Sequence, residues 1–260
     1  MHRKFFFFIV GCTQVFGAFG QNSKSVTHYQ QVWISYSNIT RFSNKLGAML
    51  DLQVRTKDHF TEDFSSTINS IGLNYYLTEA TRATAGYTYA QNYADGARTV
   101  TVPEHRPFQQ VQWTTRYRNK RMLQWVRLEE RFRRKLYSNT KLDHGYTFNF
   151  RVRYNFFYDL PLSSKGIAPH AFSLVLNDEL HINLGKQIVL NTFDQNRFSC
   201  AIKYQFSATN SLQVGYVNLF QQLTAGNRYR TVDAGRIAYL QNLDLRTHKP
   251  VRTVDHPTPQ

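Results

Sequence analysis

The sequence predicts an all-β chain, an up-and-down antiparallel transmembrane β-barrel of about 10–12 strands after a cleaved signal peptide. Three observations predict this class. Apolar and polar residues alternate with period two along nearly every ordered-looking segment, the segments run for about ten to thirteen residues where globular strands run for about five to six, and an export signal begins the chain. No long segment shows the 3.6-residue period of an amphipathic helix.

The first twenty residues have the features of a secretory signal peptide. A basic start at residues 2–4 precedes an apolar stretch that continues to Phe19, and Ala18 and Gly20 occupy the small-residue positions of a cleavage site. The alternative is a lipoprotein signal that ends at Cys12, although its apolar region would be very short. The predicted division is therefore 1–20 signal peptide, 21–247 β-barrel and 248–260 polar, proline-containing tail.

Composition excludes several other classes. The 260 residues carry a formal charge of +15, which becomes +13 when Arg3 and Lys4 leave with the signal peptide. An aromatic content of 15% excludes a disordered basic tail protein, and two cysteines exclude a disulfide scaffold or a Cys-rich zinc module. A mean hydropathy of −0.48, with no later apolar run of 18 residues, excludes a bundle of membrane helices.

Eleven segments carry the alternation. In the clearest, 145–157, every second residue from Tyr146 to Phe156 is apolar, and Thr, Asn or Arg stands between them. Successive side chains of a strand lie on opposite faces, so each segment has one apolar and one polar face. In chain order the candidate strands are 29–36, 46–56, 67–77, 82–92, 107–118, 121–133, 145–157, 171–182, 195–206, 211–222 and 234–246.

A count of eleven strands departs from the even number that is usual in single-chain bacterial barrels. Either 29–36 is not a full crossing, which leaves ten strands, or one strand is missed, which gives twelve. About ten residues per strand, tilted by about 40°, would span roughly 25 Å, the height of an outer-membrane apolar band. The tail after residue 247 is not strand, so the terminal aromatic residue usual in such barrels is absent, which counts against this fold.

The connections alternate in length, which is typical of short periplasmic turns and long extracellular loops. The short ones are predicted at 78–80, 119–120 and 207–210, with a moderate one at 159–169, and the long ones at about 57–66, 92–106, 135–144, 183–194 and 223–233. Aromatic residues gather near the short turns, as in the interfacial girdle of a membrane barrel. Ordinary cross-strand aromatic packing is the alternative explanation.

Three segments, with several glycine–aromatic pairs, resemble a known family. They are Glu104-His105-Arg106-Pro107-Phe108, Arg127-Leu128-Glu129-Glu130-Arg131-Phe132 and Asp194-Gln195-Asn196-Arg197-Phe198, and the pairs include Gly86-Tyr87 and Gly215-Tyr216. Together they resemble domain-of-unknown-function family 2490 over about residues 29–246. The resemblance implies an outer-membrane β-barrel of a Gram-negative bacterium, and it implies no particular reaction or ligand.

The alternation also assigns a face to the charged residues. Placing charge on the lipid side costs about 2–4 kcal/mol at the bilayer midplane, so charged residues should face the lumen. We expect a polar cluster at the extracellular mouth of an Arg-rich lumen, made of Glu104, His105, Arg106, Gln109, Arg127, Glu129, Arg131, Arg151, Arg153, Glu179, His181, Gln195 and Arg197. Either these groups satisfy one another as a plug that rigidifies the barrel, or they form a ligand or channel site. Glu130 and Asp178 break the parity.

The function that follows is an outer-membrane barrel of structural or narrow, porin-like type. The first alternative is a lipid-modifying hydrolase at the outer mouth, with His105 or His181 as the base. Neither histidine has an obvious serine nucleophile two to four residues away, although Ser173 and Ser199 lie on neighbouring strands. The second is a soluble periplasmic lipocalin-like barrel, whose interior should be apolar. We expect no cofactor and no metal, because a zinc site from the two histidines has no third ligand.

Location and partners follow from the export signal and the charge. We expect the chain to pass through the Sec pathway to the bacterial outer membrane. Outer-membrane lipids and lipopolysaccharide are the expected partners, with the basic segment 131–141 meeting lipopolysaccharide phosphates. Other envelope proteins are a second candidate class. We expect no nucleic-acid binding, because the basic residues alternate with apolar ones on many strands and do not form one patch.

Overall fold

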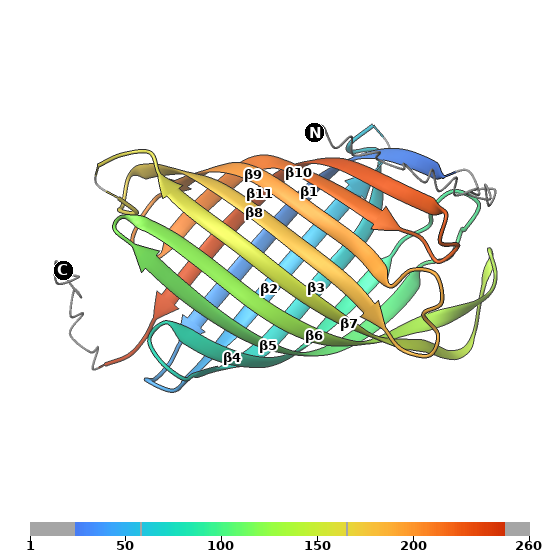
Figure 1. Ribbon diagram of the computed structural model, residues 1–260, viewed down its shortest axis with the longest axis horizontal. Helices are drawn as coiled ribbons and strands as arrows, with labels where there is room; N and C mark the ends of the chain where they lie inside the picture. The colour runs from blue at the N-terminus through green and yellow to red at the C-terminus, as the bar shows by residue number, and fades with distance from the viewer. Residues whose placement is uncertain (1–23, 58, 165, 248–260) are drawn as a thin grey trace, which may run out of the picture.

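In the computed structural model, which describes residues 24–57, 59–164 and 166–247, eleven strands close into one barrel. Figure 1 shows the strands running obliquely around the barrel wall. The predicted signal peptide 1–20 and tail 248–260 lie outside the described residues. The described part contains no helix long and apolar enough to cross a membrane.

Each of the eleven candidate segments forms a strand, which confirms the all-β prediction. Alternation of apolar and polar side chains lets one face of each strand pack inward while the other faces outward. The strands are β1 (Ser25–Arg41), β2 (Leu46–Lys57), β3 (Asp63–Tyr76), β4 (Thr81–Asn92), β5 (Val102–Tyr117), β6 (Lys120–Ser138), β7 (Lys141–Pro161), β8 (Ala171–Leu184), β9 (Phe193–Gln205), β10 (Asn210–Gln222) and β11 (Arg228–Asp244).

The strand count is eleven, so the expectation of either ten or twelve was wrong. The first segment is a full strand of 17 residues. Neighbouring strands in the chain run antiparallel, so the first and last of an odd number run in the same direction. β1 accordingly pairs in parallel with β11, from Ser25 opposite Arg228 to Arg41 opposite Asp244. All other pairings between the described strands are antiparallel, so we call the β1–β11 pairing the parallel seam.

The two ends of the barrel are more alike than the sequence predicts. We call the end with the connections 42–45, 77–80, 118–119, 162–170 and 206–209 the short-turn end, and the end with 58–62, 93–101, 139–140, 185–192 and 223–227 the long-loop end. The predicted loop 135–144 is mostly strand, because β6 and β7 keep pairing as far as Ser138 and Lys141. Figure 1 shows this hairpin projecting past its neighbours.

The interior has an apolar side and a polar side. Trp33, Val217, Leu219, Val232 and Ala234 form a buried cluster on β1, β10 and β11. Across the barrel, β5 to β9 direct charged and amide side chains inward, and many of these are buried. The outer face is the reverse, because large apolar side chains are exposed on most of the strands.

Ion pairs of Glu79 with Arg41 and Arg246 link the strands at the short-turn end near the parallel seam. Arg41 of β1 donates from Nη1 and Nη2 to the two carboxylate oxygens of Glu79, each at 2.7 Å, and its guanidinium lies 4.0 Å from the ring centre of Tyr76. Arg246, just after β11, donates to Glu79 Oε1 at 3.1 Å. The hydrogen bonds from Arg41, with those from Arg246, lower the pKa of Glu79.

We predict that Glu79→Gln lowers the thermal midpoint at pH 7 by a few degrees, about the effect of losing up to 1 kcal/mol in a barrel of this size. A lowered folded-state pKa adds stability that is fully present above the unfolded pKa, near 4.3, and is lost as the pH falls through the folded value. The difference between the wild type and Glu79→Gln should therefore shrink below about pH 4. Melting curves from pH 7 to 3 test this, and a constant difference would contradict it.

Candidate functional site

The structure brings eleven of the thirteen predicted site residues onto the inner face of five adjacent strands. They come from β5 to β9: Glu104, Arg106, Arg127, Glu129, Arg131, Arg151, Arg153, Glu179, His181, Gln195 and Arg197. Asp194 of β9 joins them into one connected set of hydrogen bonds and ion pairs, because it lies within 4.0 Å of both Arg131 and Arg151. We call these twelve residues the ion-pair network.

Glu104 lies in the part of the network near the long-loop end. It lies two residues into β5 and is fully buried. Arg106, on the same strand and the same face, donates from Nε at 2.9 Å and from Nη2 at 3.0 Å to its two oxygens. Arg131 of β6 donates to Glu104 Oε1 at 2.5 Å and also lies 3.7 Å from Asp194. One carboxylate thus holds two guanidinium groups.

Glu129 lies midway along β6 and is the centre of the network. Arg151 donates to its Oε2 from Nε at 2.8 Å, and Arg153 donates to its Oε1 from Nη1 at 2.5 Å. Arg151 also donates from Nη1 to Asp194 Oδ2 at 2.9 Å, which ties β7 to β9 past the intervening β8. Glu129 is 1% exposed and Asp194 3%, so water is largely excluded here.

Glu179 of β8 extends the network toward the middle of the barrel. It accepts hydrogen bonds from Arg153 and lies 3.5 Å from Arg197 Nη1. His181 Nε2 lies 3.2 Å from Glu179 Oε1. Gln195 completes the group when its amide oxygen faces its neighbours, because it then accepts from Arg197 Nε at 2.9 Å and from His181 Nδ1 at 3.1 Å.

The burial of these charges decides what the arrangement can do. An isolated buried ion is strongly unfavourable, and it is tolerated only when paired and hydrogen-bonded. Here each buried glutamate meets two or more guanidinium groups, whose planar forks match carboxylate oxygens. The network therefore cross-links the inner faces of β5 to β9.

Two predicted site residues, His105 and Gln109, face outward and do not join the network. Their neighbours Glu104 and Gln110 are buried inside, and side chains alternate along a strand, so odd-numbered residues of this part of β5 lie on the outer face. His105 hydrogen-bonds to the Tyr87 hydroxyl, and Gln109 donates to Glu130 at 3.4 Å. The expectation that both belong to the cluster was wrong.

The placement of the two histidines also bears on the enzyme and zinc alternatives. His105 and His181 lie on opposite faces of the barrel wall, so they do not share a metal ion. Within the described residues, no group of three or more His, Cys, Asp or Glu is placed to hold one. The hydrogen-bonding side chains next to them are Tyr87 for His105 and Gln195 for His181.

Sequence reasoning missed Asp194, which is as buried and as well paired as the glutamates. The alternation placed this residue in a loop before the ninth strand. In the structure the register shifts between His181 and Ile182 of β8, and both Asp194 and Gln195 are buried inside. Such a bulge turns two successive side chains the same way, and a period of two cannot anticipate it.

Sequence reasoning also missed the residues that face the network from the opposite wall of the barrel. Arg55 of β2 stacks on the indole of Trp33, with its guanidinium carbon 3.8 Å from the ring centre, and Arg197 approaches the same ring at 5.8 Å. Trp33 donates from Nε1 to Gln31 at 2.7 Å. The tryptophan thus bridges β2 and the network on β9, and no local sequence signal pairs these strands.

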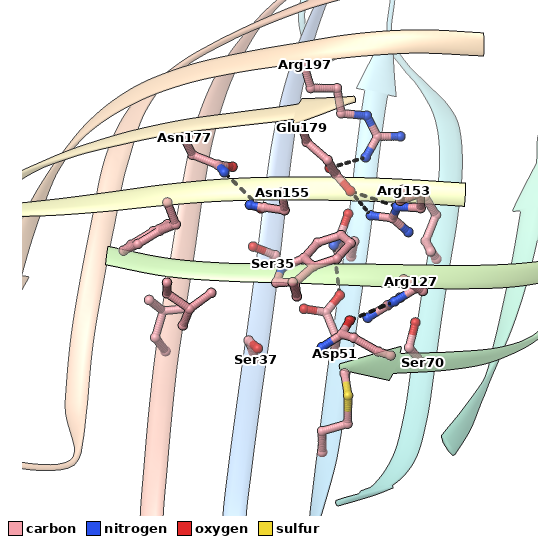
Figure 2. A pocket seen from close by; sticks show the side chains of 18 of the residues that line it. Ser35, Ser37, Asp51, Ser70, Arg127, Arg153, Asn155, Asn177, Glu179 and Arg197 are labelled. Atoms are coloured by element: carbon pink, nitrogen blue, oxygen red, sulfur yellow. Dashed lines mark hydrogen bonds and ion pairs between the residues drawn. The ribbon is translucent and has the colours of Figure 1, made fainter. Parts of the chain in front are cut away.

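Below the network, toward the short-turn end, lies an internal cavity of about 330 Å³. Figure 2 shows Asp51, Arg127, Arg153 and Glu179 directed into it from different strands, with Ser35, Ser37 and Ser70 along its wall. Arg106, Arg153 and Arg197 of the network form its inner boundary, and Arg82 and Arg121 lie near its other end.

Fold and site together define an eleven-stranded, closed β-barrel with an internal network of arginine–carboxylate pairs. The chain belongs to the family described as Protein of unknown function (DUF2490), whose family model matches residues 30–230, as the resemblance in the sequence implied. No curated protein sequence and no solved structure matches the chain.

We predict that Arg151→Ala destabilises the protein by about 3–5 kcal/mol, because it leaves Glu129 and Asp194 as buried carboxylates with fewer partners. Urea unfolding followed by tryptophan fluorescence measures the change. Arg134→Ala is the matched control, since this arginine lies on β6 outside the network and its effect should stay below about 1 kcal/mol. Equal midpoints for the two variants would show that the network does not stabilise the barrel.

Proposed function

We propose that this protein is an outer-membrane β-barrel of structural or narrow-pore type, with an Arg-rich lumen closed by the ion-pair network. One observation carries the proposal: the barrel has its charges buried inside and its large apolar side chains exposed outside. A water-soluble barrel requires the opposite arrangement, and a lipocalin-like barrel in particular requires an apolar interior. A membrane barrel requires a polar interior and an apolar outer face, because lipid surrounds the barrel.

The extent of the exposed apolar surface supports this location. Soluble monomers rarely expose a contiguous apolar patch larger than about 300–600 Å². Here Leu73 is 71% exposed and Ile71 62%, and similar residues continue around the wall. Outward-facing examples on other strands are Ile34, Leu52, Tyr87, Val111, Val126, Tyr154, Phe172, Ile202, Val214 and Ile237.

Aromatic side chains gather at two levels of the outer face, as the interfacial girdles of membrane barrels do. Toward the short-turn end, Phe172 and Tyr204 lie with ring centres 4.8 Å apart, and Phe206 packs on Tyr204 at 4.9 Å. Toward the long-loop end, the His105 ring lies 5.3 Å from Tyr89 and 5.7 Å from Tyr146. The sequence indicated only the first girdle.

Three outward carboxylates fit an apolar band about 25 Å high that starts at the short-turn end. Asp178 lies seven residues after the start of β8, Glu130 ten after the start of β6, and Asp233 eleven before the end of β11. At about 3.3 Å per residue and a tilt of about 40°, these positions are roughly 18–28 Å from that end. Glu130 and Asp233 thus lie at the far edge of the band, and Asp178 lies inside it. Each acid accepts a hydrogen bond from a neighbouring strand, which lowers the cost of placing it there.

Beyond this band the β6–β7 hairpin would extend into water on the far side. It carries Arg133, Arg134, Lys135 and Lys141. Guanidinium and ammonium groups form charge-assisted hydrogen bonds with phosphates. We therefore propose lipopolysaccharide as a partner of this hairpin, with the long-loop end at the cell surface.

Membrane fractionation tests the location. We predict that the protein sediments with outer membranes and that its gel migration changes on heating, because a folded barrel resists detergent until heated. Recovery entirely in the soluble periplasmic fraction would overturn the proposal.

Conductance in planar bilayers tests the state of the lumen. We predict a low conductance for the wild type and a higher one for Arg131→Ala, which removes the guanidinium linking Glu104 to Asp194. The residual current should favour anions, because arginine exceeds acid among the residues that line the cavity. Arg134→Ala, outside the network, is the control. An Arg131→Ala conductance equal to wild type, with unchanged stability, would contradict both the plug and the narrow pore.

A further inference from the structure

The cavity below the ion-pair network contains more positive charge than its acids neutralise. Of the eight arginines that line it, Arg106, Arg121, Arg153 and Arg197 are each paired with a carboxylate at 3.5 Å or less. The other four are Arg55, Arg82, Arg127 and Arg236, and the lining acid that remains is Asp51.

Three of these four arginines surround the inner part of the cavity. Arg55 is 92% buried, and its polar partner is Gln53 at 3.0 Å, with no carboxylate of a described residue within 4.0 Å. Arg127 donates to Gln110 at 2.8 Å and lies 3.9 Å from Glu129. The guanidinium of Arg236 makes no hydrogen bond with the described residues, and the acid that attracts it most strongly is Asp51. Buried guanidinium groups with unused donors attract an anion.

A layer of apolar side chains lies between this charged region and the short-turn end. Ile39 is paired with Met49 across β1 and β2, Leu123 is paired with Phe157 across β6 and β7, and Leu240 lines the cavity from β11. The layer lies about four to six residues from Arg55, Arg127 and Arg236 along the strands, or roughly 10–15 Å along the barrel. A passage for small ions alone needs no such layer, because the lumen of a conducting barrel is polar.

We propose that the cavity binds an amphipathic anion, specifically a medium-chain aliphatic carboxylate. Its carboxylate would accept hydrogen bonds from Arg127 and Arg236 beside Arg55, and its chain would lie against Ile39, Met49, Leu123, Phe157 and Leu240. Arg82 and Arg121 near the short-turn end would draw the anion in. The volume of about 330 Å³ is at the lower end of small-molecule sites, which suits one short chain.

The inference goes beyond the proposed function and does not depend on membrane insertion, because the cavity lies inside the barrel. The test therefore uses the full chain in whichever phase fractionation recovers it, so a wrong location and an empty cavity give separate results. Trp33 and Trp125 line the cavity and Trp113 faces outward. A Trp113→Phe background thus restricts tryptophan fluorescence to the cavity.

The probe is 11-bromoundecanoate, whose bromine quenches nearby tryptophan. We expect saturable quenching that decanoate reverses and that neutral 11-bromoundecanol does not reproduce. Arg127→Gln and Arg236→Gln should each weaken binding at least about tenfold, the effect of one lost charge-assisted hydrogen bond. Arg134→Gln, the same substitution on the outside of β6, should leave binding unchanged.

Leu240→Gln separates the amphipathic ligand from a simple anion. It should weaken bromoundecanoate quenching and leave quenching by iodide unaltered, since iodide has no apolar chain. Urea midpoints near wild type establish that the variants are folded. Three results would each overturn the proposal: equal quenching by the alcohol, unchanged affinity in both arginine variants, or quenching by iodide without quenching by bromoundecanoate.

Discussion

The pairing of inward-facing guanidinium groups with buried carboxylates is the interaction on which the rest of the structure depends. A barrel of about eight strands has an interior that side chains just fill, and eleven strands leave a little more room. Charged groups in so narrow a space must satisfy one another, because water reaches them poorly. β5 to β9 supply both signs of charge at matching levels, with Glu129 and Arg151 at the centre. On the opposite wall the ring of Trp33 makes cation–π contacts with Arg55 and Arg197, in place of a carboxylate.

The division into a polar inner face and an apolar outer face also explains which parts of the fold the sequence predicts. Alternation locates all eleven strands, because an apolar outer face and a polar inner face give the strongest possible period-two signal. It does not locate the strand ends of the β6–β7 hairpin, where Arg133, Arg134 and Lys135 are charged on both faces because both faces meet solvent. It also cannot detect the parallel seam, since the pairing of β1 with β11 joins the two ends of the strand region and leaves no local pattern.

The candidate site was predictable to the extent that parity holds. Residues that alternate with apolar neighbours, such as Arg151 and Arg153 between Phe150 and Tyr154, were assigned to the interior, and they lie there. Sequence proximity was less reliable than parity, because it grouped His105 with Glu104 although adjacent residues of a strand point in opposite directions. Asp194 was lost at a bulge. Contacts across the barrel, such as Arg55 with Trp33, depend on register and strand tilt, which the sequence does not carry.

The ion-pair network lies toward the long-loop end of the barrel, and the cavity lies between the network and the short-turn end. Glu104, Glu129 and Glu179 occupy successive levels from the long-loop end to the middle, and each is held by two or more guanidinium groups. Parting one such pair without a replacement partner costs several kcal/mol, so the pairs persist in the absence of a competing ion. Below the network, Arg127 and Arg236 have donors to spare in a cavity that reaches toward the short-turn end. An anion entering there would meet the excess positive charge beside the network, where the carboxylate of the proposed ligand would bind.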